Sequence, residues 1–174
     1  AGLWRLLCLC FFKDAATTEI YTLALPAALP VPIRSLTATA AGEGMLLATR
    51  AQGRILPSRR DGRNDREVAV DSRSIYHLAA TETVAGKPVY CGLAFTDERT
   101  HMAIGIDEKF HAQWTHALTA GMHQTPVRPL MSGNILDGGP YWMIPGADGS
   151  VHIVSADGTF QDVFNTGVAI RGLA

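Results

Sequence analysis

Histidine is the residue type in this sequence that is best suited to acid–base or metal chemistry. The six histidines are His77, His101, His111, His116, His123 and His152. His111 and His116 lie five residues apart in a predicted strand, so they point to opposite faces and cannot chelate one ion together. No spacing predicts that His101, His111 and His123 converge. We therefore interpret the histidines as structural or exposed residues.

Motifs of nucleophilic, nucleotide-binding or zinc-dependent enzymes are absent from the sequence. It contains no Gly-x-Ser-x-Gly, Walker loop, Gly-x-Gly-x-x-Gly or His-Glu-x-x-His. The stretch Ser132-Gly133-Asn134, with Asp137 nearby, does not form a recognisable nucleophile site. We therefore expect no catalytic residues and predict a protein that is not an enzyme.

One segment, residues 119–133 ("TAGMHQTPVRPLMSG"), is the strongest candidate for ligand binding. It is long for a connection between strands, it carries two prolines, and it includes Met122, His123 and Arg128. Long loops on rigid scaffolds often carry function. The alternative is a plain crossing whose prolines keep it from pairing with a neighbouring strand.

The elements that would position such a loop are β-strands. Near the C-terminus, Ala-Asp-Gly followed by Ser or Thr occurs twice, at 147–150 and 156–159. Asp-Gly between apolar runs is a strong hairpin signal. We expect three strands joined by these two turns, with residues 141–144 as the first.

Composition limits the classes of function. The chain has 174 residues, of which 47% are hydrophobic, so it can bury a core as one domain or as part of a larger one. The formal net charge of −1 gives no reason to expect nucleic acid or an anionic membrane. Residues 3–12 are apolar but too short to span a bilayer, so we predict a buried strand there and no membrane span.

The three cysteines, Cys8, Cys10 and Cys91, do not suggest a redox or zinc site. Cys8 and Cys10 share one face of the predicted strand, which is poor geometry for a mutual disulfide. No Cys-x-x-Cys occurs. We expect all three to be small buried apolar residues.

An internal repeat organises the chain. Four stretches share the outline of a polar loop followed by a β-rich strand, and they recur about every 40 residues, the length of a four-stranded propeller blade. The stretches are 11–25, 55–70, 93–106 and 134–146. This predicts a single domain, 1–174, of about four units that start near 3, 55, 93 and 134.

Two further pairs of segments look alike. Residues 74–80 match 150–156, which puts His77 and His152 at equivalent places, and residues 110–118 match 160–168. For residues 110–118 the alternative is an amphipathic helix, because Phe110, Trp114 and Leu118 recur every four residues. The repeat favours a strand.

These phrases resemble the blades of repeat β-propellers of the FG-GAP/VCBS and PQQ-like kinds. The resemblance rests on "DGRNDREVAV" with "IYHLAA", and on "GADGSVHIVSADGTFQDVFNTG", and it covers roughly residues 55–174. It implies an all-β fold of β-propeller blades, each a four-stranded antiparallel meander, in an incomplete or small propeller. It also implies a periplasmic or extracellular location.

The loop of that family binds Ca²⁺, and it corresponds here to residues 57–65. Asp61, Gly62 and Asp65 are kept, but Pro57 and Arg59 occupy the first two ligand positions. Asp61 and Asp65 are therefore the candidate metal ligands. Calcium needs several oxygen ligands, so we expect no cofactor in so depleted a loop.

A clear repeat without a catalytic constellation predicts a non-enzymatic interaction module whose partner is an unidentified protein or carbohydrate. The resemblance leaves two alternatives open. One is a propeller enzyme, either a PQQ-like dehydrogenase or a polysaccharide lyase, and the other is a purely structural repeat.

Overall fold

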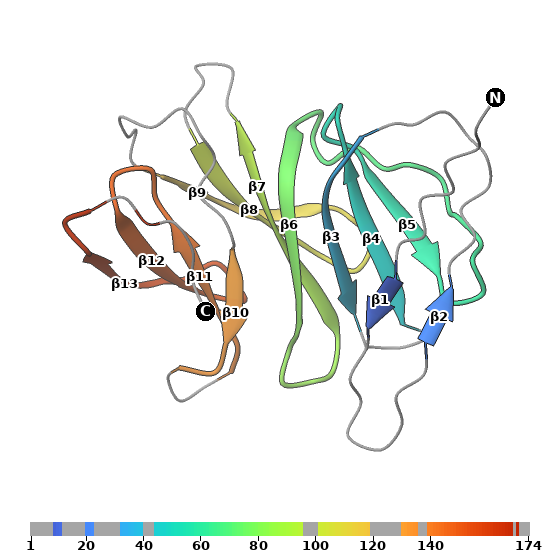
Figure 1. Ribbon diagram of the computed structural model, residues 1–174. Helices are drawn as coiled ribbons and strands as arrows, with labels where there is room; N and C mark the ends of the chain where they lie inside the picture. The colour runs from blue at the N-terminus through green and yellow to red at the C-terminus, as the bar shows by residue number, and fades with distance from the viewer. Residues whose placement is uncertain are drawn as a thin grey trace. The chain divides into compact units, whose positions relative to one another are not determined.

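The computed structural model describes residues 9–11, 20–22, 32–39, 44–95, 101–118, 130–135, 139–168 and 170. Regular secondary structure in these residues is entirely β, as the predicted all-β class requires (Figure 1). Consequently none of them forms a helix that could cross a membrane. The chain divides into two compact units, Ala1–Pro30 and Val31–Ala174.

The first unit contains one antiparallel strand pair among its described residues. Strand β1 (Leu9–Phe11) pairs with β2 (Ile20–Thr22). The strand expected over residues 3–12 is thus present in part, and its remainder lies outside the described residues, as does Cys8.

The described residues of the second unit form three antiparallel sheets, each a meander in which sequential strands are neighbours. The first sheet consists of β3 (Ile33–Thr39), β4 (Met45–Arg50) and β5 (Ile55–Arg59). The middle sheet consists of β6 (Ser74–Glu82), β7 (Pro88–Phe95), β8 (His101–Ile106) and β9 (Ala112–Ala117). The third consists of β10 (Met131–Gly133), β11 (Tyr141–Pro145), β12 (Ser150–Ser155) and β13 (Phe160–Asn165).

A short irregular segment extends the first sheet beyond β5. Val68 exchanges both backbone hydrogen bonds with Ile55, at 2.8 and 2.9 Å, and Asn64 forms an isolated bridge with Ser58. The strand expected over "EVAV" (67–70) is therefore reduced to single bridges, because Val70 turns away to pair with Arg73.

The middle sheet is buried on both faces. Tyr90 and Ala94 of β7 pack toward the first sheet, whereas Cys91 and Leu93, which alternate with them, pack toward the third. This explains why residues 88–95 read as a continuous apolar run. One core cluster is Leu47, Ile55, Val70, Ile75, Leu78, Tyr90, Ala94, Ile104 and Ile106. The other is Tyr76, Cys91, Leu93, Ala103, Leu118, Leu130, Trp142, Ile144 and Val154.

Trp114 of β9 ties the middle sheet to the third. Its indole Nε1–H donates to the carbonyl of Ala156, at 3.1 Å, in the turn between β12 and β13. Gly105 and Gly158 leave room for the ring, since a Cβ on either would lie 2.0 or 2.3 Å from an indole atom. Gly158 also has a φ of +92°, which favours glycine.

The two Asp-Gly turns were predicted correctly. β11 pairs with β12 across the first and β12 with β13 across the second. In each turn the aspartate side chain accepts a backbone hydrogen bond at 3.1 Å: Asp148 from Ser150 and Asp157 from Thr159. Asp107, between β8 and β9, accepts one from Lys109 in the same way. The repeated tetrapeptide is a repeated side-chain-to-backbone turn.

The repeat boundaries differ from those expected. The three sheets begin at Ile33, Ser74 and Met131, so the expected starts near 55 and 93 fall within sheets. Met102 lies in the third strand of its sheet and Met143 in the second, so they are not equivalent. Strands of one sheet have similar sequences, so two short segments that match can belong to different strand positions in their sheets.

The two paired likenesses had different outcomes. Residues 110–118 and 160–168 contain β9 and β13, which are both fourth strands, so the strand prediction there is confirmed over the helical alternative. His77 lies in a first strand and His152 in a third, so these histidines do not occupy equivalent places.

We predict that Gly105→Ala lowers the free energy of unfolding by about 1–3 kcal/mol, because the new methyl group would overlap the Trp114 ring and overpack the interface between sheets. Gly133→Ala is the matched control, since its Cβ would only touch Met143 Cε at 3.4 Å. Urea unfolding followed by circular dichroism measures both. Equal losses in the two variants would contradict the role given to Trp114.

Candidate functional site

A pocket of about 320 Å³ lies where the ends of the first strands of the three sheets approach one another. The C-terminal parts of β3 and β6 contribute to it, together with residues just after β10 and before β11. Strand β6 contacts both β3 and β10. Its lining residues are Ala38, Thr39, Ala80, Thr81, Glu82, Asn134 and Pro140.

The lining of the pocket combines one acidic residue and three polar residues with three apolar residues. Glu82 is the only charged residue in the described lining, and Thr39, Thr81 and Asn134 supply hydroxyl and amide groups. Thr39 is buried, whereas Glu82 and Asn134 are exposed. The pocket therefore offers accessible acceptors on a rigid sheet framework.

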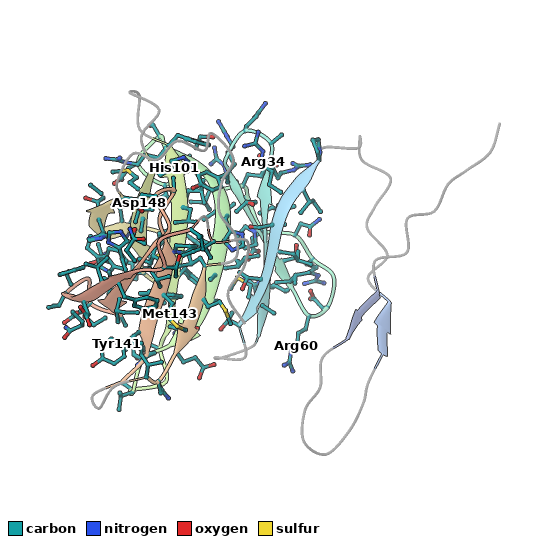
Figure 2. All side chains as sticks on the ribbon, turned by 60° about the vertical axis from the view of Figure 1, so that its left-hand side comes forward. Arg34, Arg60, His101, Tyr141, Met143 and Asp148 are labelled. Atoms are coloured by element: carbon teal, nitrogen blue, oxygen red, sulfur yellow. The ribbon has the colours of Figure 1, made fainter. Side chains whose placement is uncertain are left out.

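A second polar cluster lies between the middle and third sheets. His116 Nε2 of β9 is 3.0 Å from His152 Nδ1 of β12, and His152 Nε2 is 2.9 Å from Ser150 Oγ. Ser150 Oγ in turn lies 2.5 Å from Asp148 Oδ1. Asp148, labelled in Figure 2, belongs to the turn before β12. We call these four residues the His116–Asp148 chain.

The proton positions in the His116–Asp148 chain follow from the carboxylate of Asp148. The Asp148 carboxylate only accepts, so Ser150 uses its single hydrogen to donate to it. His152 Nε2–H then donates to Ser150 Oγ, and His152 Nδ1 accepts from His116 Nε2–H. Every hydrogen bond is satisfied when both imidazoles are neutral.

The pKa values agree with that assignment. Burial lowers the pKa of His116, and burial together with the neighbouring His116 lowers the pKa of His152. The hydrogen bond from the Ser150 hydroxyl holds the pKa of Asp148 below its ordinary value. The chain thus holds neutral histidines and an ionised aspartate.

Access to the serine in this chain is restricted. Ser150 is 3% exposed and His152 is 8% exposed. The Phe160 ring stacks on His116, with ring centroids 5.6 Å apart. The His116–His152 contact is the hydrogen-bonded tie between the sheets, and Ser150 supports His152 from the same strand, in line with the structural interpretation of the histidines. Sequence reasoning missed the cluster, although the spacing of two puts Ser150 and His152 on one face of β12.

The other histidines belong to separate environments. His101 Nδ1 is 2.8 Å from the buried Tyr76 hydroxyl, and burial lowers the His101 pKa. His111 lies beside Asp107 in the β8–β9 turn. The candidate ligand-binding residues Met122, His123 and Arg128 lie outside the described residues, so the structure neither places them nor brings them together.

Asp61 and Asp65 interact with backbone and arginine groups. Asp61 Oδ1 accepts from the Arg63 backbone at 2.9 Å, and Asp65 Oδ2 lies 3.4 Å from Arg59 Nε. Arg60, which follows Arg59 in the chain, extends from the same turn (Figure 2). No group of three or more His, Cys, Asp or Glu that could hold a metal ion occurs among the described residues. The local geometry is that of a turn with solvated charges.

Cys91 has the environment expected from the sequence. Its thiol is fully buried in β7, and burial raises the pKa of the thiol. It acts as a small apolar core residue, as expected.

We predict that Ser150→Ala lowers the free energy of unfolding by about 1–3 kcal/mol, because it removes the hydroxyl that accepts from the buried His152 Nε2–H. Asp148 loses the same hydroxyl but keeps the hydrogen bond from the backbone N–H of residue 150. Ser155→Ala is the matched control: Ser155 makes the same kind of contact with Asp157 at an exposed turn, where substitutions typically cost less than about 0.5 kcal/mol. Chemical denaturation distinguishes the two. A loss confined to Ser155→Ala would contradict this account.

Stability should fall as the pH decreases from about 7 to 5. The unfolded chain binds protons at histidine with a pKa of about 6.5, whereas the folded chain holds His116 and His152 neutral. Proton uptake on unfolding therefore favours the unfolded state below about pH 6.5. Denaturation midpoints across this range measure the effect.

The variant His116→Gln should reduce that pH dependence, because it removes one imidazole that the fold keeps neutral. His111→Gln removes an exposed imidazole and serves as the control. A pH dependence that survives unchanged in His116→Gln would argue against the proton assignment.

Comparisons with known proteins give the fold and no family. No protein-family model matches this sequence, and no curated protein matches it. Among solved structures, the chain is similar to the WD40 domain of coronin from Toxoplasma gondii, with 19% identity and a TM-score of 0.55. That alignment covers 81% of this chain and 37% of the coronin domain chain.

Two weaker likenesses accompany it. One is to a protein of unknown function from Bacteroides caccae, at 13% identity and a TM-score of 0.46, over 84% of this chain and 49% of that one. The other is to apo AztD from Citrobacter koseri, at 17% identity and a TM-score of 0.49, over 90% and 41%. The chain spans less than half the length of each of these proteins.

The antiparallel four-stranded meanders and the likeness to the coronin domain together establish the architecture. A more specific relation to FG-GAP/VCBS or PQQ-like repeats stays a prediction. The second unit of this chain is built from β-propeller blades.

Proposed function

We propose that this chain is a non-enzymatic β-propeller module that binds a ligand or a protein partner at the pocket formed by the ends of β3, β6 and β10. The observation that carries the proposal is that three sheets contribute residues to one polar pocket. A site assembled from several sheets is held in place by the core that joins them.

The size and the lining of the pocket support binding. Its volume of about 320 Å³ is at the lower end of the range typical of small-molecule sites. The charged and polar groups, Glu82, Thr81 and Asn134, are held at or beside strand ends, where they are more precisely placed than on a long loop.

Two other functions remain as alternatives. A quinone-dependent enzyme would need a tryptophan that stacks on its cofactor, and the two tryptophans among the described residues, Trp114 and Trp142, pack between sheets. A purely structural repeat would need no pocket at all. We also expect export to the periplasm or the cell exterior, an expectation that rests on the resemblance to exported propellers.

The test is a screen of a chemically diverse fragment library against ¹⁵N-labelled protein by NMR. We expect the binding fragments to shift the backbone amides of Thr39, Thr81, Glu82 and Asn134. Fragments that shift only amides remote from these residues would contradict the proposal, as would a library without any binder.

A pair of variants makes the result specific to the pocket. Asn134→Trp places a bulky ring in the lining and should abolish the shifts, because it fills the space. Gln161→Trp adds the same ring on the exposed strand β13 and should leave them unchanged. Binding that is insensitive to Asn134→Trp would place the site elsewhere.

A further inference from the structure

We infer that the pocket recognises a protonated alkylamine, a short apolar chain that ends in an ammonium group. This inference names the ligand class and rests on the proposed function of the same pocket. It follows from the charge, the hydrogen-bonding groups and the apolar residues of the lining.

The charge of the lining favours a cation. Glu82 is the one carboxylate in the described lining, which contains no arginine, lysine or histidine to balance it. Lys87 lies in the same β6–β7 hairpin, but it is exposed and outside the lining. An anionic ligand would meet Glu82 with no positive partner in the pocket, which makes this class unfavourable.

The hydrogen-bonding groups match an ammonium group. An ammonium donates three hydrogen bonds and accepts none. The Thr39 and Thr81 hydroxyls and the Asn134 amide oxygen can all accept, and a carboxylate accepts more strongly than a neutral group. A ligand rich in hydroxyl groups could also bond here, but the lining offers it no aromatic ring to pack on.

The apolar residues complete the match. Ala38, Ala80 and Pro140 line the same space and would cover a short methylene chain. The pocket thus combines acceptors for a charged end with a surface for an apolar stem. A free alkylamine and a lysine side chain of a partner protein share this chemistry.

The experiment compares three probes of equal length by NMR titration: n-butylammonium, n-butanol and butyrate. We expect n-butylammonium to shift the amides of Thr39, Thr81 and Asn134 with a dissociation constant of about a millimolar, the range for so small a ligand. Butanol should bind at least about fivefold more weakly, and butyrate should not bind. Equal binding of butylammonium and butanol would overturn the inference.

Two variants test the carboxylate. Glu82→Gln keeps the shape but removes the charge, and it should weaken butylammonium binding by about fivefold or more. Glu108→Gln removes an exposed carboxylate from the β8–β9 turn and is the control. Weakening by both variants alike would indicate general attraction to an acidic surface and would overturn the inference.

Failure of the ligand class differs from failure of the pocket. If other fragments bind at Asn134 and the amines do not, the inference is wrong while the proposed function stands. If nothing binds there, both fail. A further titration distinguishes a free alkylamine from a lysine side chain of a partner protein. Its probe is lysine blocked at the backbone, with an Nα-acetyl group and a C-terminal amide, so that the side-chain ammonium stays free. Tighter binding of this probe than of butylammonium indicates a protein lysine, and equal binding indicates a free amine.

Discussion

The structure depends on the burial of both faces of the middle sheet. Strands β6–β9 place alternate side chains against the first and the third sheet, so neither neighbour can be removed without exposing a core. Burial of apolar area is worth roughly 25 cal/mol per Å², and this sheet contributes residues to the core clusters on both of its faces. The pocket lies at its edge, since β6 supplies Ala80, Thr81 and Glu82.

Polar contacts fix how the middle and third sheets are placed against each other. Trp114 reaches the Ala156 carbonyl across the interface, and the His116–Asp148 chain crosses the same interface. Apolar surfaces alone tolerate sliding, whereas a buried hydrogen bond is satisfied in only one register. These contacts select one arrangement of β9 against β12, and the apolar cores supply most of the stability.

The strands and turns were largely predictable from the sequence, and their grouping into sheets was not. Asp-Gly turns at 148 and 157 set local geometry through their own side chains, so β11, β12 and β13 followed directly. The sheet boundaries depend on which strand begins a blade, and strands such as β6 and β12 look alike in sequence. The pocket joins residues as distant as Thr39 and Asn134, which no short pattern relates. Of the segment chosen from the sequence, 119–133, residues 119–129 with Met122 and His123 lie outside the described residues, and its last three residues form β10.

The edge of the third sheet has its own consequence. Strand β13 is exposed along its whole length and carries Phe160, Val163 and Phe164. An apolar edge strand is a template for pairing with another chain and hence for aggregation. Asp162, in the middle of this strand, places a charge where a second copy would have to add, as gatekeeper residues do. A carboxylate at the centre of β13 therefore opposes the pairing of this strand with a second copy of the chain.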